Sequence, residues 1–548
     1  MIFPNGRFIF EEESLYGGIH QGLPTHIRHY ELLRNVRPLE DGTLINDRGI
    51  RKLSSNIMGG GSYDTWGGID CQFSDGSQKL ILFQNAAADS DAYLFVSADR
   101  SFTDQGVSMA QLRPTALMFA NKLHTFDGST MRTMDGSGTW ATPGTADANA
   151  CKVAAVYANR IIAGGDSGNP YRFILSGVRD ASTWDLDLAE SITNLSGEAI
   201  NCIGTVGPFL VIGGRSWFQS YYRGMTTLTT WDSANMSRLT GPINQGSFCE
   251  AALRQGKGNY LAFFWAEDGP KMIAQLGNEL PVVIGLEGPL YHFLRGEEQN
   301  GMPAIEVSRF TYVETAFFSE YDEIRFAFSL DGDTRNKALL CLNVSSALAF
   351  AKDQDRTYPI FRLRDNQTSG LPVSCLFSCQ VNSSTGLPST SGRRKNFSAY
   401  NGVVYELDAD NATDDNGTPI PIELIRTGYS GHEEKVRSID KSFEHVNITA
   451  SVPGSYTLYA DLEVDGGLSS DTDEVDLSGD LSLWSDLTED GTWGDGGLWM
   501  DADYLNHRLE FDTVGKVAKL RIYDNGNIRG SLTIDPWVIE GALEDRNA

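Results

Sequence analysis

The sequence predicts an all-β protein, an irregular β-propeller of six to eight blades followed by a C-terminal β-sandwich. Three observations support this prediction. Glycine accounts for 57 of 548 residues, above the roughly 7% of average chains, so tight turns are expected to be frequent. Short apolar runs recur between Gly, Asn and Asp turns, as they do in strands. Long helical patterns are nearly absent: Pro114 interrupts one at Met109–Phe119, and Ser345–Lys352 is expected to be one short helix.

Seven hairpins are predicted, each with an apolar strand, a turn of Gly, Asn or Asp, and a second strand. These residues suit tight hairpin turns because they tolerate positive φ. The turns recur roughly every 40 to 70 residues, which suits four-stranded units stacked as propeller blades. The hairpins are Lys79–Phe83 with Tyr93–Val96, Leu123–Phe126 before Asp127-Gly128, Arg160–Ala163 with Tyr171–Leu175, Phe209–Ile212 with Ser216–Tyr222, Tyr260–Trp265 with Lys271–Gln275, Ile324–Phe328 with Leu339–Val344, and Asn396–Tyr400 with Val403–Leu407.

The composition changes near residues 408–420, where an acidic stretch precedes Pro419 and Pro421. This stretch is predicted to be a linker or long loop. We expect three parts: residues 1–75, a segment packing on the propeller; residues 76–415, the propeller; and residues 416–548, the sandwich. Thr385–Lys395, which ends in Arg393-Arg394-Lys395, is expected to be an exposed loop. The predicted sandwich strands are Phe443–Ala450, Tyr456–Val464, Ala518–Tyr523 and Leu532–Ile539.

The charge narrows the possible partners. Lys and Arg total 44 and Asp and Glu total 72, so the net charge is 44 − 72 = −28. Such a chain is unsuited to gripping nucleic acid phosphates or anionic membranes. We expect neither a signal peptide nor a membrane span, because no basic segment precedes an apolar core and no apolar run approaches about 18 residues. The seven scattered cysteines are expected to be buried, reduced thiols.

Candidate metal ligands are few. Cys375 and Cys379 form C-x-x-x-C, but no second Cys or His pair lies nearby to complete a zinc site. His26 and His29 likewise lack further ligands. The acidic stretches Asp408–Asp415 and Asp471–Asp476 depart from the calcium-loop pattern, so we expect solvated acidic loops, with opportunistic cation binding as the alternative. We therefore expect no metal and no cofactor.

Catalytic motifs are equally weak. Gly165-Asp166-Ser167-Gly168 spells the nucleophile signature of chymotrypsin-like proteases, but no upstream histidine, including His124, has a suitable context, so a hairpin turn is expected. Met58–Ser62 is Gly-rich but lacks the Gly-Lys-Ser/Thr of a phosphate loop. Asp490–Trp493 is similar to the Asp-box of sialidase propellers, with the wrong spacing and a single copy. Trp484, Trp493 and Trp499 are expected to fill a small core, with sugar stacking as the alternative.

Four stretches resemble segments of the tail nozzle or hub proteins of short-tailed bacteriophages, also called tail tubular or virion stabilisation proteins. They occur in the family's order and span nearly the whole chain. The stretches are Asn35–Pro38 with Asp41–Leu44 and Arg48–Arg51; Asn159–Gly165 with Asn169–Ser176 and Asp180–Trp184; Gly241–Asn244 with Ala262–Gly269; and Trp484, Trp493-Gly494 and Trp499 with Arg508-Leu509, Gly515-Lys516 and Leu520–Ile522.

The resemblance implies a non-enzymatic structural protein of the virion tail, assembled in the host bacterial cytoplasm. Family members form a homo-hexameric ring below a dodecameric tail adaptor, near tail fibres, spikes or a tip protein, and surround the channel for DNA ejection. Trp, Asn and Gly positions are architectural in this family, so no catalytic residue carries over. The chain departs from the pattern in the blade near Thr115–Thr142 and at its N-terminus. An acidic wall would repel phosphates and let DNA pass without sequence-specific binding.

Other classes of protein stay open. One is a different virion part, such as a receptor-binding tail tip. Another is a propeller-type carbohydrate-binding or glycan-hydrolysing protein, which needs paired carboxylates or an arginine cluster at one propeller mouth. A third is a cellular propeller scaffold for protein partners. Oligomeric state distinguishes these classes.

Overall fold

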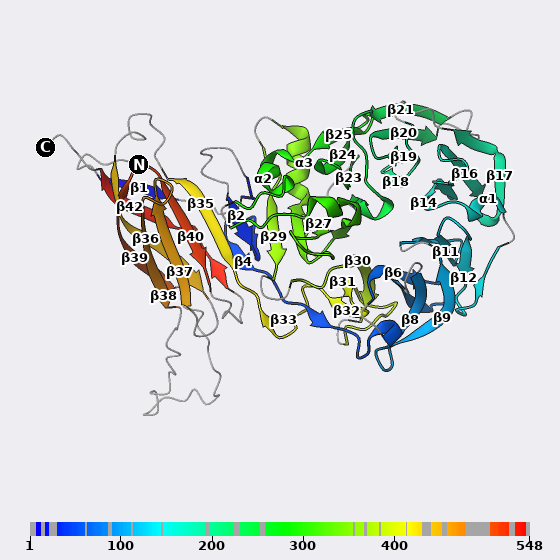
Figure 1. Ribbon diagram of the computed structural model, residues 1–548, viewed down its shortest axis with the longest axis horizontal. Coiled ribbons are helices and arrows are strands. Elements are labelled where there is room, and N and C mark those ends of the chain that lie inside the picture. The colour runs from blue at the N-terminus through cyan, green and yellow to red at the C-terminus, as the bar shows by residue number, and fades with distance from the viewer. Residues whose placement is uncertain are drawn as a thin grey trace, which may run out of the picture. The chain divides into compact units, whose positions relative to one another are not determined.

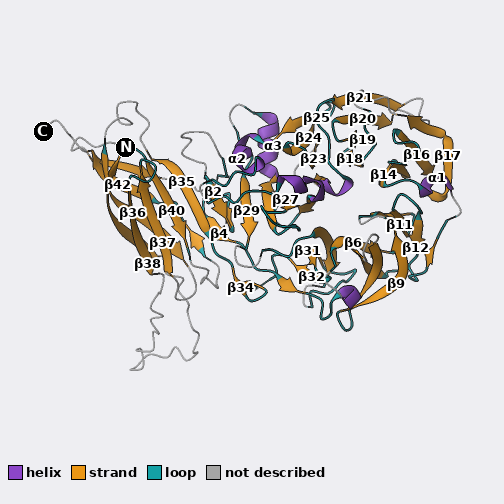
Figure 2. Ribbon diagram, viewed as in Figure 1, coloured by secondary structure: helices purple, strands orange, loops and turns teal. Residues whose placement is uncertain are grey.

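The computed structural model of the chain consists mainly of strands, with a few short helices (Figure 2). Two compact units are present: residues 1–49, 362–368 and 410–548 form the first, and residues 50–361 and 369–409 form the second. The structure describes residues 7–11, 17–20, 30–60, 63–85, 90–110, 113–143, 146–191, 197–223, 231–251, 258–299, 301–354, 357–366, 370–382, 385–410, 412, 414–429, 440–451, 457–476, 505–524 and 532–543.

The second unit holds six four-stranded antiparallel sheets and a further set of three strands (Figure 1). The sheets are β6 (Thr65–Gln72), β7 (Gln78–Asn85), β8 (Ser90–Val96) and β9 (Ser101–Met109); β10 (Thr115–Phe119), β11 (Lys122–Phe126), β12 (Arg132–Met134) and β13 (Trp140–Ala141); β14 (Val153–Tyr157), β15 (Arg160–Gly164), β16 (Arg172–Gly177) and β17 (Asp180–Ser191); β18 (Cys202–Val206), β19 (Phe209–Gly214), β20 (Trp217–Arg223) and β21 (Trp231–Ser237); β22 (Phe248–Ala251), β23 (Asn259–Ala266), β24 (Gly269–Leu276) and β25 (Val282–Gly285); and β30 (Cys375–Val381), β31 (Arg393–Tyr400), β32 (Val403–Glu406) and β5 (Arg51–Lys52). The further set is β26 (Glu314–Phe318), β27 (Glu323–Phe328) and β28 (Ala338–Asn343).

These strand sets form a closed ring. The first strand of each set contacts the first strand of the next, from β6 through β10, β14, β18, β22, β26 and β30, and β30 contacts β6 again. Such radial repetition is a β-propeller, so the predicted fold of six to eight blades is confirmed. Each predicted hairpin provides the second and third strands of its own set, from β7–β8 to β31–β32.

Short helices occupy the connections of this unit. Asn343 caps α3 by accepting a hydrogen bond from the Ser346 amide, which explains why a helix begins there. The predicted helix at Ser345–Lys352 is therefore confirmed. The helices among the described residues are η1 (Met58–Gly60), α1 (Ala146–Asn149), η3 (Gln245–Ser247), η4 (Gly288–Leu290), α2 (Tyr291–Leu294), η5 (Val307–Tyr312) and α3 (Val344–Lys352). No helix in the described part of the chain is long and apolar enough to cross a membrane.

The ring closes with a strand from the N-terminal side of the chain. Strand β5 pairs with β32, so that Lys52 lies opposite Tyr405 and Arg51 opposite Glu406. The buried Glu406 carboxylate accepts from Arg51 at 2.6 Å and lies 3.4 Å from the Lys395 ammonium. Thr385–Lys395 was expected to be an exposed loop. Arg393 and Arg394 are exposed, but together with the buried Lys395 they begin strand β31, so the loop ends earlier than predicted. The sequence does not reveal the buried carboxylate that pairs with Lys395.

Glycines let neighbouring blades approach closely. A Cβ on Gly68 of β6 would lie 2.7 Å from Cδ1 of Phe377 on β30, and one on Gly204 of β18 would lie 2.2 Å from Cε1 of Phe248 on β22. Phe377 belongs to an apolar cluster that joins the first and last blades through Leu80 and Phe397. The aromatic rings therefore fill the space that a glycine leaves open on the adjacent strand.

We expect Gly68→Ala to destabilise the propeller by about 1–3 kcal/mol, because the added methyl group overpacks the closing contact with Phe377. Gly288→Ala is the matched control, since nothing lies within 4 Å of its Cβ position. Denaturant unfolding of both variants checks this. Equal midpoints for the two variants would contradict the packing of Gly68 against Phe377.

The cysteines of the propeller are free thiols. Cys71, Cys202, Cys375 and Cys379 are buried on strands, and burial raises the pKa of each thiol. Burial also raises the pKa of Cys151 to about 12. Because the thiolate is the reactive form, we expect these cysteines to react slowly in the folded protein.

Titration with a thiol reagent near pH 8 is therefore expected to proceed slowly on the folded protein. All seven cysteines of the chain should react at once in denaturant, because unfolding exposes the thiols to the reagent. Rapid reaction of several thiols in the folded state would contradict their buried placement.

The first unit contains two groups of paired strands. One runs β1 (Arg7–Glu11), β42 (Val538–Leu543), β36 (Lys441–Ser451), β41 (Thr533–Ile534), β4 (Leu44–Asn46) and β3 (Val36–Pro38), with β39 (Leu505–Gly515) also on β36. The other runs β29 (Phe361–Asp365), β2 (Leu32–Arg34), β35 (Glu423–Tyr429), β40 (Ala518–Tyr523), β37 (Thr457–Val464) and β38 (Ser469–Asp476); β33 (Asp414–Asp415) and β34 (Thr418–Pro419) form a small hairpin.

Buried and partly exposed residues alternate along β37 and β40, as in sheets with one face against a core. The two groups touch through the rings of Phe10 and Tyr429, whose centroids are 6.1 Å apart. The indole of Trp537 also donates to the Tyr429 hydroxyl at 2.8 Å. The C-terminal sandwich as a whole stays a prediction, and its tryptophans Trp484, Trp493 and Trp499 lie outside the described residues.

The units differ from the predicted division at 75 and 415. Residues 1–49 group with the C-terminal part, because β2 pairs with β35 and β4 pairs with β41. Residue 50 already belongs to the propeller. Pairing between strands hundreds of residues apart leaves no local signal in composition, which explains the difference.

Candidate functional site

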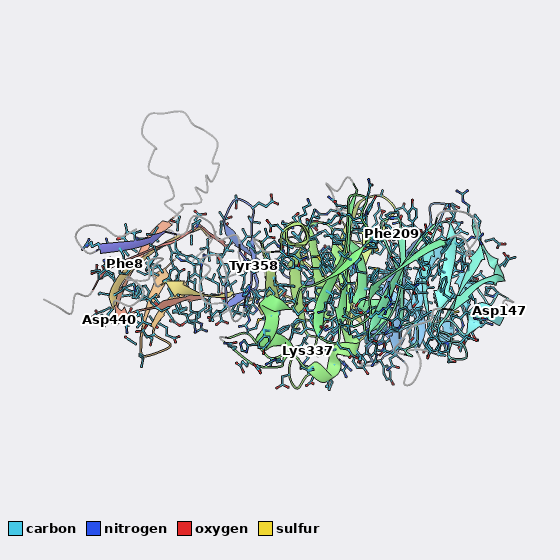
Figure 3. All side chains as sticks on the ribbon, turned by 90° about the horizontal axis from the view of Figure 1, so that it is seen from above. Phe8, Asp147, Phe209, Lys337, Tyr358 and Asp440 are labelled. Atoms are coloured by element: carbon cyan, nitrogen blue, oxygen red, sulfur yellow. The ribbon has the colours of Figure 1, made fainter. Side chains whose placement is uncertain are left out.

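An arginine cluster lies at the end of the propeller where its innermost strands begin. Figure 3 shows the side chains of the molecule from above. We define the cluster as Arg113, Arg309, Arg335, Asp64 and Glu314. Asp64 directly precedes β6, Arg113 lies two residues before β10, and Glu314 begins β26. Arg335 lies in the connection between β27 and β28. Glu314, the first residue of β26, pairs with Ala327 near the end of β27, so this connection lies beside the start of β26.

Two ion pairs connect different blades within this cluster. Arg113 Nη1 lies 2.9 Å from Glu314 Oε1, and Arg113 Nη2 donates to the Tyr312 carbonyl at 2.9 Å. Arg335 Nε lies 2.6 Å from Asp64 Oδ1. The pairs thus tie the start of the ring to the β26–β28 strands.

Aromatic rings complete the cluster. The Arg113 guanidinium lies 4.6 Å from the Trp66 ring centroid and 5.5 Å from that of Tyr312. The Arg309 guanidinium lies 3.9 Å from the Tyr312 centroid. Such cation–π contacts stabilise by about 0.5–2 kcal/mol each, depending on exposure.

Burial and the arginines act on the two carboxyls in opposite directions. Burial raises the pKa of Glu314, and Arg113 partly offsets this shift. Burial likewise raises the pKa of Asp64 against the charges of Arg335, Arg309 and Arg113. The cluster therefore offers guanidinium donors and carboxylate acceptors in a partly desolvated place, and it includes no Ser, Cys or Lys nucleophile.

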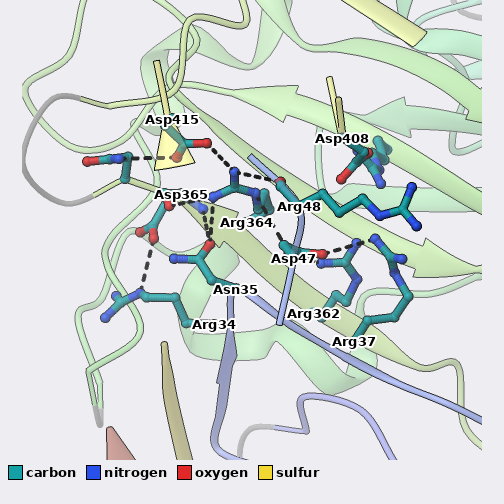
Figure 4. A network of polar contacts seen from close by, with 12 residues as sticks. Arg34, Asn35, Arg37, Asp47, Arg48, Arg362, Arg364, Asp365, Asp408 and Asp415 are labelled. Carbon is teal, nitrogen blue, oxygen red and sulfur yellow. Dashed lines mark hydrogen bonds and ion pairs between the residues drawn. The ribbon is translucent and has the colours of Figure 1, made fainter. Parts of the chain in front are cut away.

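A second, buried polar network lies inside the first unit (Figure 4). Asp47 is its centre: Arg37 Nη2 lies 3.0 Å from its Oδ1, and Arg362 and Arg364 contact its Oδ2. Arg364 also pairs with Asp415. Buried charges are tolerated when they are paired in this way.

The same network also includes contacts of Arg34 and Asn35 with two other segments of the chain. Arg34 Nε lies 3.2 Å from Asp365 Oδ1, and Arg34 also pairs with Glu423. The Asn35 side chain accepts from the Asp365 amide at 3.0 Å and donates to the Pro421 carbonyl at 2.6 Å. Burial raises the pKa of Asp365, while Arg34 and Arg364 lower it. The network joins three separate segments of the chain and has a structural role.

Asp47→Ala is expected to destabilise the protein by about 3–5 kcal/mol, because the three arginines lose a shared buried acceptor. Asp410→Ala is the matched control, since Asp410 pairs with Arg48 where both side chains are more than one-third exposed, and its loss should cost at most about 1 kcal/mol. Thermal and denaturant unfolding measure both effects. A small effect of Asp47→Ala would contradict the network.

The protease signature lies in a turn. Ser167 is exposed between β15 and β16, and Asp166 accepts from the Gly168 amide at 2.8 Å and the Asn169 side chain at 3.1 Å. His124 is buried on β11 in another blade, where its Nε2 lies 3.2 Å from the Phe119 carbonyl. Burial lowers the pKa of His124 to about 4. The structure does not bring these residues together as a triad.

The acidic stretches differ from the prediction of solvated loops. Asp408 and Asp415 are buried and pair with Arg325 and Arg364 respectively. Asp471 and Asp473 lie on strand β38, where their carboxylates accept from backbone amides of β39 at 3.0 Å. The prediction was wrong for these four residues, because the pairing arginines and amides are remote in sequence, whereas Asp410 is more than one-third exposed.

The residues considered as metal ligands were expected to form no metal site. Cys375 and Cys379 lie on β30 as buried free thiols, and no group of three or more His, Cys, Asp or Glu arranged for a metal occurs in the part that the structure describes. His26, His29 and Asp490–Trp493 lie outside the described residues, as do Gly61 and Ser62 of the glycine-rich stretch. Sequence reasoning missed the arginine cluster, because Arg113 and Glu314 carry no motif and stand far apart in the chain.

Comparisons with known proteins show weak similarity. No family model and no curated protein matches the chain. The N-terminal domain of Nup159 is 9% identical, with 68% of this chain and 98% of that chain covered and a TM-score of 0.35. Virginiamycin B lyase from Staphylococcus aureus is 10% identical, with 65% and 97% covered and a TM-score of 0.37. Values this low carry no argument about activity, substrate or partners.

Proposed function

We propose that this protein is a ring-forming structural component of a short bacteriophage tail, the nozzle or hub through which DNA is ejected. The proposal rests on the resemblance of four ordered stretches of the sequence to that family. One observation supports it most: described residues of these stretches have architectural roles. They hold turns and buried networks instead of forming a catalytic centre.

The first stretch supplies two residues of the buried network, Asn35 and Arg37. Asn35 adopts φ 57°, a conformation that Asn tolerates better than most residues, and its side chain joins β2 to Pro421 and Asp365. Arg37 of the same stretch pairs with Asp47. These residues shape the backbone, as expected of a structural protein.

The second stretch forms tight turns of one blade. Asn159 takes φ 60° in the turn between β14 and β15. The Asp180 carboxylate accepts from the Ser182 amide at 2.8 Å, and the Trp184 indole donates to the Ala181 carbonyl at 3.1 Å. Asn-containing turns and Asx-type capping explain why these residue types occur here.

Electrostatics favours passage of DNA over its retention. The chain carries a net charge of −28, and many of its buried arginines are already neutralised by carboxylates. A hexamer carries 6 × −28 = −168. Such a ring would repel phosphates, so DNA would pass through without sequence-specific contacts.

A glycan-binding propeller is the second candidate. The arginine cluster favours it, because Asp64 and Glu314 lie with three arginines at one end of the ring. Under this alternative the protein would act without forming a hexameric ring.

The solution mass distinguishes the two functions. Light scattering, with and without the tail adaptor or other virion components, is expected to give a species of 6 × 60.1 = 360.6 kDa that shows a central hole in negative-stain images. A protein that stays monomeric with every virion component would contradict the nozzle proposal. Such a result would leave the glycan-binding candidate.

A further inference from the structure

We propose that the arginine cluster binds an oxyanion, a carboxylate or phosphate carried by a small saccharide, with Arg309 as the primary contact. This binding site deepens the glycan-binding candidate named above and does not depend on the structural role in a tail.

Arg309 is the guanidinium left over after the ion pairs of the cluster are formed. Arg113 pairs with Glu314, and Arg335 pairs with Asp64. The Arg309 guanidinium forms no hydrogen bond or ion pair with any described residue, and its buried Nε has no partner. Its guanidinium stacks on the Tyr312 ring at 3.9 Å and interacts electrostatically with the carboxylates of Asp64 and Glu306 without forming an ion pair with either of them.

The charge of the cluster favours an anion. Within the cluster as defined, three arginines and two carboxylates sum to 3 − 2 = +1, in a chain whose net charge is −28. The Glu306 carboxylate, which also interacts electrostatically with Arg309, accepts hydrogen bonds from Ser308. A guanidinium presents a planar fork of N–H donors that matches the two oxygens of a carboxylate or phosphate. The stack on Tyr312 holds this fork in one orientation, so less entropy is lost when a ligand binds.

The hydrogen-bond donors and acceptors beside Arg309 suit the hydroxyl groups of a sugar. Arg113 Nε and the Trp66 indole N–H are buried donors without hydrogen-bond partners among the described residues. Asp64 and Glu314 supply carboxylate oxygens that can accept from hydroxyl groups. The donors and acceptors come from η5 and the starts of β6, β10 and β26, which meet at one end of the ring.

Isothermal titration of the full-length protein tests the proposal with three matched probes: D-glucuronate, D-glucose 6-phosphate and D-glucose. We expect at least one of the two anionic sugars to bind, with at least tenfold higher affinity than glucose, and Arg309→Gln to weaken that binding at least tenfold. Preference for glucuronate identifies the ligand group as a carboxylate, and preference for glucose 6-phosphate identifies it as a phosphate.

Arg295→Gln is the matched control, because the Arg295 guanidinium also stacks on a tyrosine, Tyr291, at 3.9 Å but lies outside the cluster. This variant should bind as the unaltered protein does. Arg309→Lys keeps the charge and loses the fork, so it should bind with intermediate affinity, and thermal unfolding verifies that each variant folds. Absence of binding by both anions, equal binding of glucose, or equal effects of Arg309→Gln and Arg295→Gln would overturn the proposal.

Discussion

Closure of the ring between β30 and β6 is the contact on which the propeller depends. Each blade buries its faces against two neighbouring blades. If one contact between blades were open, apolar surface would be exposed on both of the blades that meet there. The junction is sealed by β5 on β32, by Phe377 over Gly68, and by polar bonds such as the Gln380 amide to Asp70 at 3.0 Å. Because β5 comes from the N-terminal side, the ring is complete only when both ends of the propeller sequence are in place.

Ion pairs between arginines and poorly exposed carboxylates are the second feature that both units share. In the first unit, Asp47 holds several arginines in a largely desolvated network. In the propeller, Arg113 and Arg335 bridge blades through Glu314 and Asp64. Both arrangements use arginine, whose planar fork contacts several acceptors at once. They differ in exposure, and only the arginine cluster leaves a guanidinium, Arg309, without an ion pair among the described residues.

Much of the propeller could be predicted from the sequence, because its signals are local. Turns such as Asn401-Gly402, where both residues adopt positive φ, and apolar runs such as Tyr260–Trp265 mark the middle hairpin of each blade. Non-local features could not be predicted in this way. The pairing of β2 with β35, the burial of Asp415 and the meeting of Arg113 with Glu314 each join segments that are distant in sequence. Residues 408–420 are acidic and rich in turn formers, so they were predicted to be a loop, although Asp408 and Asp415 are buried and paired with arginines.

Hydrogen exchange at β5 tests the closed ring most directly. The Leu53 amide, which directly follows β5, donates to the Val404 carbonyl at 2.8 Å, so a peptide spanning residues 50–54 should be protected to the same degree as one spanning residues 396–406. Comparable slow exchange in the two peptides is the result that the closed propeller predicts. Fast exchange at residues 50–54 beside a protected β31–β32 hairpin would contradict closure by the N-terminal strand.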